Sequence, residues 1–145
     1  MNDKILDCSD LDKYLGKPIA PARMKEALHN NDFRRWVQAM HYANLLHYDH
    51  DFAAAGRYGR LVAPQSFAVA TDDGHGAGPA CVGFIPDSHL IFGGDEWWFY
   101  GPRIFGGDQI TNEKIPFDYA VKETSFAGPT CFQRGDNNYY NQHGD

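Results

Sequence analysis

The apolar residues of this chain follow two different periodicities, and this change along the sequence most constrains its fold. In the first half, Phe33, Trp36, Val37 and Met40 recur at i, i+3, i+4 and i+7, the spacing of one helix face. From residue 89 onward, short apolar or alternating runs are separated by Gly, Pro and Asp, which is typical of strands and turns. Helices followed by strands predict an α+β domain whose helices pack on one face of an antiparallel sheet.

Three helices are predicted in the first half. The first is capped by Asn30 or Asn31, and a short second helix covers Asp51–Ala55 and ends at Gly56, a common C-terminal cap. The third begins at Pro64, because proline suits the first helical position. Residues 71–80 contain three glycines and a proline, which predicts a loop.

Five strands are predicted in the second half: His89–Gly93, Glu96–Tyr100, Gln109–Ile115, Ala120–Glu123 and Asn138–Asn141. The pentapeptide Ile-Phe-Gly-Gly-Asp occurs at residues 91–95 and again at 104–108. This repeat is either a paired ligand loop or two similar turns of one sheet, and we favour the turns. The aromatic residues 97–100 are expected to pack in the core or across strands.

Composition indicates a single globular domain and argues against nucleic-acid binding and a membrane span. The chain has 145 residues and 43% hydrophobic residues, enough for one globular domain covering residues 1–145. A net charge of −6 argues against nucleic-acid binding, which favours a basic surface. No apolar run approaches the roughly 20 residues of a membrane span, and the acidic N-terminus does not resemble a signal peptide. Three dispersed cysteines indicate reduced thiols and a cytoplasmic protein.

One cluster of polar side chains suggests chemistry. Tyr42, Asn44 and His47 bring a phenol, an amide and an imidazole together, shortly before the helix start at residues 63–66. Histidine exchanges protons readily near neutral pH, and a helix start offers free backbone N–H groups. A base beside an anion-stabilising amide is the arrangement that acyl chemistry requires.

The stretch from Asp32 to Ile110 resembles the MaoC-like hydratase/dehydratase group, and especially its N-terminal-type dehydratase domains. The family motif reads Asp-x-Asn-Pro-[Leu/Ile]-His-x-Asp, and Asn44, Leu46, His47 and Asp49 fit four of its positions. The match continues through Ala53 or Ala54, Gly59-Arg60 and Leu61-Val62, and Pro102–Asp108 resembles the family's Pro-x-x-x-Gly-Asp strand. The resemblance implies a hot-dog fold, in which a curved antiparallel sheet wraps around a central helix.

The chain departs from the family pattern at four places. Tyr42 stands where the family has its catalytic aspartate, and Leu45 replaces the proline after the asparagine. Pro64-Gln65 replaces His-Gly at the central helix start, so the backbone donor would come from Gln65, which keeps its N–H. Residues 139–145 resemble a strand entering a hairpin whose return strand is missing. Either the chain is truncated, or a partner covers the edge of the sheet.

The resemblance implies addition or removal of water at the double bond of an enoyl-CoA thioester, with no cofactor and no metal. In this chain His47 would transfer the proton and Asn44 would orient the water. The Gln65 N–H would hold the thioester oxygen, with Ala63, Pro64 and Arg60 beside the substrate. An ordinary phenol is protonated at neutral pH, so Tyr42 would assist as a donor and not as a base.

Three alternatives remain open at this stage. His47 could instead be a structural histidine that bonds a backbone carbonyl. The whole chain could be a non-catalytic subunit that shapes the acyl tunnel of a partner retaining the Asp/His pair. A third possibility is a metal site formed by His41, His47, Asp49, His50 and Asp51, although ligands alternating along one loop usually point apart.

The partners implied by the resemblance are an acyl-CoA and another hot-dog subunit. A one-layer curved sheet leaves an edge and a face uncovered, so a homodimer or a heteromer is expected, without nucleic acid or membrane. Among Arg34, Arg35, Arg57 and Arg60, the last is the best candidate to meet a coenzyme A phosphate.

Overall fold

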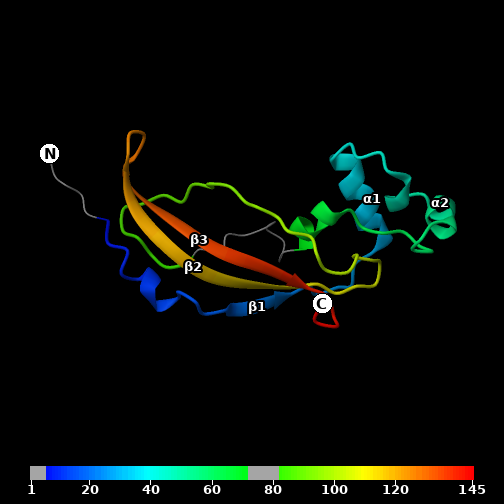
Figure 1. Cartoon of the computed structure of the whole chain (residues 1–145), viewed down its shortest axis with the longest axis horizontal. Coiled ribbons are helices and arrows are strands. Elements are labelled where there is room, and N and C mark those ends of the chain that lie inside the picture. The colour runs from blue at the N-terminus through cyan, green and yellow to red at the C-terminus, as the bar shows by residue number, and fades with distance from the viewer. Residues whose placement is uncertain (1–5, 72–81) are drawn as a thin grey trace. The chain divides into compact units, whose positions relative to one another are not determined.

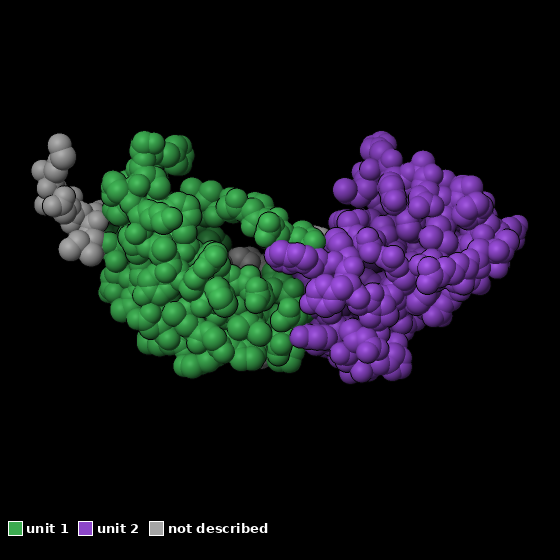
Figure 2. All heavy atoms as spheres, in the orientation of Figure 1, with its two compact units in different colours: residues 1–21, 78–97, 113–138 green, residues 22–77, 98–112, 139–145 purple. Residues whose placement is uncertain are grey.

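The computed structural model describes residues 6–71 and 82–145. Its elements, in chain order, are η1 (Leu11–Lys13), β1 (Ile19–Arg23), α1 (Asn30–Ala39), η2 (Leu45–His47), α2 (His50–Ala55), η3 (Gln65–Thr71), β2 (Thr111–Thr124) and β3 (Gly128–Tyr140), where η denotes a 3₁₀ helix (Figure 1). The chain divides into two compact units, one of residues 1–21, 78–97 and 113–138 and one of residues 22–77, 98–112 and 139–145 (Figure 2). The single domain expected over 1–145 stays a prediction.

The strands form one sheet in the order β1-β2-β3, and β2 and β3 form a long hairpin (Figure 1). Its turn ends at Gly128, whose φ of 70° lies in the left-handed region that glycine adopts without strain. Thr124 closes the turn by accepting the Ala127 N–H at 3.2 Å through its hydroxyl. The strands predicted at 109–115 and 120–123 are therefore parts of one strand, and the strand predicted at 138–141 is the end of β3.

Strand β1 corrects the prediction that helices precede all strands. It contains Pro21. Proline lacks an N–H and is tolerated on a strand that has only one neighbour, and β1 lies at the edge of the sheet. Hydrogen bonds just before and just after β1 show that it runs antiparallel to β2. The Gly16 N–H donates to the Pro116 carbonyl at 2.8 Å, and the Met24 N–H donates to the Ile110 carbonyl at 3.0 Å.

The two strands predicted at residues 89–93 and 96–100 are wrong, because the structure has no regular element there. Trp98, Phe99 and Tyr100 are 71%, 44% and 89% exposed, so the expected core packing of residues 97–100 is also wrong for most of that segment. The repeated pentapeptide does not form two turns of a sheet either. Only its second copy closes a turn, through the Asp108 N–H and the Phe105 carbonyl at 3.2 Å.

The predicted helices are present, with corrected ends. Helix α1 is capped by His29, not by Asn30 or Asn31. The His29 ring accepts the Asn31 N–H at 3.2 Å, and Asp32 accepts the His29 N–H at 2.9 Å, which together form a capping box. Helix α2 ends before Gly56 as predicted. The third helix begins after Pro64 but is a 3₁₀ helix, and the loop predicted over 71–80 lies outside the described residues except for Thr71.

The core of the second unit brings α1 and η3 together. Phe67 of η3 makes edge-to-face contacts with Phe33 at 5.1 Å and with Trp36 at 6.0 Å between ring centroids. The Trp36 indole N–H donates to the Ser66 hydroxyl at 3.1 Å. The beginning of η3 is thus held by Phe33 and Trp36 of the predicted apolar face of α1. Met40, which was predicted on the same face, follows the helix and is 57% exposed.

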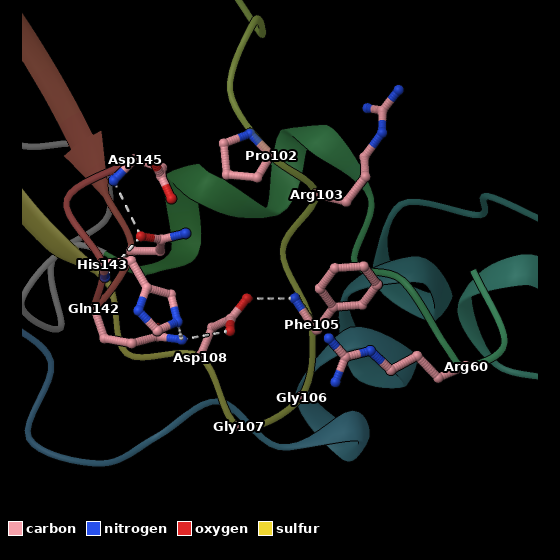
Figure 3. A pocket seen from close by; sticks show the side chains of 11 residues that line it. Arg60, Pro102, Arg103, Phe105, Gly106, Gly107, Asp108, Gln142, His143 and Asp145 are labelled. Carbon is pink, nitrogen blue, oxygen red and sulfur yellow. Dashed lines mark hydrogen bonds between the residues drawn. The ribbon is translucent and has the colours of Figure 1, made fainter. Parts of the chain in front are cut away.

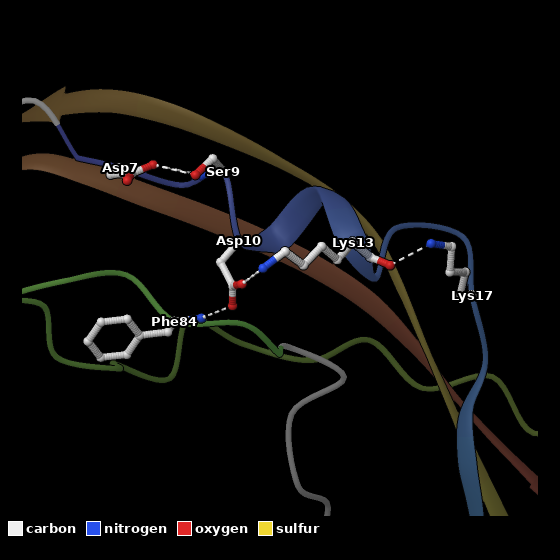
Figure 4. Close-up of polar contacts among 6 residues, drawn as sticks. All are labelled: Asp7, Ser9, Asp10, Lys13, Lys17 and Phe84. Atoms are coloured by element: carbon white, nitrogen blue, oxygen red, sulfur yellow. Dashed lines mark hydrogen bonds and ion pairs between the residues drawn. The ribbon is translucent and has the colours of Figure 1, made fainter.

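In the first unit, η1 is anchored on a segment far along the chain. Asp10 accepts the Phe84 N–H at 2.9 Å and pairs with Lys13 (Figure 4). The Lys13 ammonium, followed by the Phe84 N–H, lowers the pKa of Asp10 below its usual value. Leu11 is buried and lies against Gly83. The φ angle of Gly83 is 101°, a conformation that glycine adopts without strain.

Candidate functional site

His47 ends η2 and is buried, with 6% of its surface exposed. Its Nδ1 lies 2.7 Å from the Val62 carbonyl oxygen. A carbonyl only accepts hydrogen bonds, so Nδ1 must carry the hydrogen and donate. In the neutral ring the Nε2 atom then carries the free lone pair, and no described residue hydrogen-bonds it. The site therefore holds an imidazole whose tautomer suits a general base.

His47 bonds to Val62, and the chain continues from Val62 directly into η3. The Val62 N–H donates to Leu46 at 3.3 Å, so the turn containing His47 contacts both polar groups of the Val62 backbone. Val62 also pairs with Phe105 in an antiparallel bridge, and the Ala63 N–H donates to Ile104 at 2.8 Å. Because a chain advances at most about 3.6 Å per residue, Gln65 follows Val62 within roughly 11 Å.

The start of η3 carries the predicted backbone donor. Ala63 and Pro64 are buried, and the Pro64 carbonyl accepts the Phe67 N–H at 2.9 Å, which closes the first turn. Within the described ranges, the N–H of Gln65 has no assigned acceptor. This is expected at a helix start, where the first N–H groups have no partner inside the helix.

Tyr42 and Asn44 lie close to His47 in the sequence. Tyr42 contacts the His47 ring, whereas Asn44 bonds to the backbone of η2. The Tyr42 ring stacks against His47 with centroids 5.4 Å apart and an interplanar angle of 30°, and it is 51% exposed. The Asn44 side-chain oxygen accepts the Leu46 N–H at 3.1 Å and so caps η2. Asn44 therefore has a structural bond that sequence reasoning missed, and only its NH₂ group remains for a substrate water.

Arg60 lines a pocket of about 460 Å³ in the same unit (Figure 3). Its guanidinium lies over the Phe105 ring, 3.8 Å from the centroid. The other lining residues come from 102–108 and from the last five residues: Pro102, Arg103, Gly106, Gly107, Asp108, Asn141, Gln142, His143 and Asp145. None of Tyr42, Asn44, His47 or Gln65 lines this pocket, so among these five predicted site residues it is formed by Arg60 alone.

Sequence reasoning missed the contribution of Val62 and Phe105. The sequence contained a signal for this region, because both 59–62 and 102–108 match the MaoC-like pattern. It contained no signal that these segments pair. Among the residues that the structure describes, no three His, Cys, Asp or Glu side chains gather as metal ligands. No helix in that part of the chain is long and apolar enough to span a membrane.

Comparison with solved structures finds a similar fold in three proteins that are named as hydratases or a dehydratase. The unliganded R-hydratase PhaJ1 from Pseudomonas aeruginosa is 16% identical, with 90% of this chain and 74% of that chain covered and a TM-score of 0.63. The (R)-hydratase from A. caviae involved in PHA biosynthesis is 18% identical, with 90% and 86% covered and a TM-score of 0.57. The MaoC-like dehydratase from Rhodospirillum rubrum is 15% identical, with 92% and 86% covered and a TM-score of 0.63.

At these identities the likeness shows the fold alone, and it confirms an α+β hot-dog architecture; a sheet wrapped around a central helix stays a prediction. No curated protein sequence matches the chain. The family model of the FAS1-like dehydratase domain region matches residues 14–145, which confirms the resemblance to MaoC-like dehydratases. Since this match covers nearly all of the 145 residues, the chain belongs to the FAS1-like dehydratase domain region family.

Proposed function

We propose that this chain adds water to, or removes water from, the double bond of an enoyl-CoA thioester, with His47 as the acid/base residue. The observation that carries the proposal is the bond from His47 Nδ1 to the Val62 carbonyl at 2.7 Å, a bond that a purely structural histidine would also form. Because the carbonyl can only accept, Nδ1 carries the hydrogen, and the lone pair of Nε2 is left to exchange a proton. Membership of a dehydratase family and the fold of proteins named as hydratases support the same reaction class.

In the hydration direction, Nε2 takes a proton from a water molecule as the water oxygen bonds to the β-carbon. The π electrons move toward the thioester oxygen, which gains negative charge. Protonated Nε2 then delivers the proton to the α-carbon, so one imidazole completes the addition without a second base. This sequence of steps does not require the aspartate that Tyr42 replaces.

The Gln65 N–H is the proposed donor to the thioester oxygen. No residue of the described ranges accepts it, and the neighbouring residues are held by Phe33, Trp36 and Ile104. A donor held in place before the reaction needs no reorganisation when charge develops, and such a donor contributes about 3–4 kcal/mol. Ala63 and Pro64 are proposed to position this donor beside the substrate.

Tyr42 and Asn44 are proposed to line the site where the reacting water binds beside His47. The Tyr42 ring limits how the imidazole can turn, and its hydroxyl can donate to the water or to a substrate carbonyl. The Asn44 NH₂ group can donate to the same water while its oxygen stays bonded to Leu46.

The test is an assay of hydration of short trans-2-enoyl-CoA thioesters. The reaction is monitored as the loss of absorbance of the conjugated thioester. We expect His47→Ala to lower kcat by about 10² to 10⁴. His50→Ala is the matched control, because it removes an exposed histidine three residues away and should leave kcat unchanged. Undiminished turnover in a folded His47→Ala protein would remove His47 from the mechanism.

A second candidate function is a non-catalytic subunit of a heteromeric hydratase. The specific observation in its favour is Tyr42, which stands in place of the family aspartate and is half exposed. In that arrangement the chain shapes an acyl site whose complete Asp/His pair belongs to another hot-dog subunit. Purified chain that is inert alone, gains activity with a co-encoded homologue and keeps it after His47→Ala would favour this function over the first.

A further inference from the structure

Asn112, near the start of β2, is a buried polar residue that the proposed reaction does not use. Only 2% of its surface is exposed. Neither its side-chain oxygen nor its NH₂ group forms a hydrogen bond with a described residue. The amide can accept two hydrogen bonds and donate two, and native proteins pair nearly all buried groups of this kind. Its unused bonding capacity indicates a partner that the described part of the chain does not supply.

Asn112 lies beside the hydrophobic core of the second unit. Ile110 directly precedes β2 and is already held in the sheet, because its carbonyl accepts the Met24 N–H at 3.0 Å. Side chains alternate along a strand, so Ile110 and Asn112 share one face of the sheet, and their Cα atoms lie roughly 7 Å apart. Ile110 is buried and packs in the same core as Ala63 and Phe67. The Asn112 amide is therefore the next side chain along the face that packs against η3.

Stability alone does not favour an asparagine at this position. β2 is the central strand of the sheet, between β1 and β3 (Figure 1). β-branched and aromatic side chains suit such a strand better than asparagine does. A buried amide without hydrogen bonds also costs stability that an apolar side chain of the same size would not. A bound polar group therefore accounts for Asn112 better than packing does.

The chemistry of the amide defines the group that it would bind. Its NH₂ group needs an acceptor, and its oxygen needs a donor. A hydroxyl supplies both, whereas a carbonyl supplies only the acceptor. A charged group is disfavoured, because an apolar core penalises a charge that has no counter-ion. A neutral hydroxyl is the best match.

We propose that Asn112 binds a hydroxyl group carried on the acyl part of the thioester, beyond the β-carbon, and so selects hydroxylated acyl groups over plain alkyl chains. The proposal rests on the proposed function, which places the thioester beside Ala63, a residue of the same core as Ile110. An acyl chain that extends from the start of η3 past Ile110 reaches the Asn112 amide. A site that hydrogen-bonds a substrate hydroxyl rejects the analogue lacking it, because the buried amide is then left unpaired.

The experiment measures binding of saturated thioesters, which cannot be hydrated, by calorimetry on the full chain. The probes are octanoyl-CoA and a series of hydroxyoctanoyl-CoA thioesters whose hydroxyl lies at successive carbons from the γ to the ω position. We expect the hydroxyl at one of these positions to tighten binding roughly 10- to 100-fold relative to octanoyl-CoA. A ketone at the same carbon should gain less, because it can only accept a hydrogen bond.

Variants locate the binding site. Asn112→Leu replaces the amide by an apolar group of similar size, so the preferred hydroxyoctanoyl-CoA should bind no more tightly than octanoyl-CoA. The same variant should unfold at a higher denaturant concentration than wild type, because it removes the unpaired polar atoms. Thr111→Val is the matched control. It removes a hydroxyl from the neighbouring residue, which faces the other side of the sheet, and should keep the preference.

Two results would overturn the proposal. One is no gain in affinity from a hydroxyl at any position, or no binding of any probe, which would leave only a buried water to pair the amide. The other is a preference for the hydroxyl that survives in a folded Asn112→Leu protein.

Failure of the proposed reaction gives a different result. If no protein hydrates an enoyl thioester but wild type and His47→Ala both keep the hydroxyl preference, the reaction is wrong and the Asn112 site stands. Hydration by wild type without any hydroxyl preference would instead remove the Asn112 site and keep the reaction.

Discussion

The Nδ1 atom of His47 lies 2.7 Å from the carbonyl oxygen of Val62 and bonds to it inside the protein. This bond joins the turn after α1 to the strand-like segment that enters η3. It has both a structural and a chemical consequence. The imidazole stabilises the approach to the helix start, and the same contact determines which ring nitrogen is free to exchange a proton.

His47→Gln separates the structural role of the bond to Val62 from the chemical role of the imidazole. The glutamine NH₂ group can donate to the Val62 carbonyl, whereas alanine leaves a buried acceptor unpaired, at a cost of about 1–3 kcal/mol. We expect His47→Gln to unfold at a denaturant midpoint closer to wild type than His47→Ala does, while both variants lose hydration activity. Activity retained in His47→Gln would show that the ring is only structural.

Asn44 can be tested in the same way. Asn44→Ala removes the cap of η2 and should lower the free energy of unfolding by about 1 kcal/mol. Asn44→Asp keeps an oxygen for the Leu46 N–H but removes the NH₂ group. If that group orients the substrate water, both variants lose turnover although only the alanine variant is destabilised. Full turnover in a stable Asn44→Asp protein would restrict Asn44 to capping.

Tyr42 tests whether the missing carboxylate limits the rate. Tyr42→Asp places a second acid/base group beside the His47 ring, and we expect kcat for enoyl-CoA hydration to rise by up to about 10²-fold. Tyr42→Phe keeps the stacked ring and removes only the hydroxyl, so it measures the contribution of that donor. A Tyr42→Asp protein that is folded but no faster than wild type would contradict a water site between residues 42 and 47.

Gly106 approaches the start of α1 closely. A Cβ built on Gly106 would overlap the Asn30 side-chain oxygen, which can turn away, so Gly106→Ala should destabilise the protein by only about 1 kcal/mol. Asn30→Ala removes the obstacle, and the double variant should cost less than the sum of the two single changes. Unfolding in denaturant measures all three proteins, and strict additivity would show that the two residues do not contact.

The Asp118–Arg134 ion pair predicts a pH dependence of the β2–β3 hairpin. Arg134 lowers the pKa of Asp118 below its usual value of 3.8 through a side-chain hydrogen bond and its charge. A pKa that is lower in the folded state stabilises the protein above the unfolded-state value and loses this effect as pH falls through the folded-state value. Asp118→Asn should therefore melt below wild type near neutral pH.

In acid, that difference should disappear, because the wild-type carboxyl is then also neutral. Melting temperatures at about pH 7 and about pH 2 provide the comparison. Both side chains are substantially exposed, at 43% for Asp118 and 69% for Arg134, so the effect should be small and reduced by salt. An Asp118→Asn difference that is equal at both pH values would contradict the assignment.

Much of the helical part of the fold follows from the sequence alone, because helical hydrogen bonds join near neighbours. The spacing of Phe33, Trp36 and Val37 predicted α1 and its buried face, and Gly56 and Pro64 marked the end of α2 and the start of η3. The ends were less predictable. A histidine caps α1 in place of the neighbouring asparagines, since its ring and Asp32 complete a reciprocal pair of bonds.

Strands depend on partners that lie far away in sequence, and this is where local patterns failed. Residues 89–100 have strand-like composition and form no strand, whereas the edge strand β1 forms around Pro21. Likewise, the sequence by itself identified His47 from its type and its polar neighbours, and the family resemblance added Gln65 and Arg60. Only the tertiary structure decided that His47 bonds Val62 and that Arg60 stacks on Phe105, because those contacts join segments that only folding brings together.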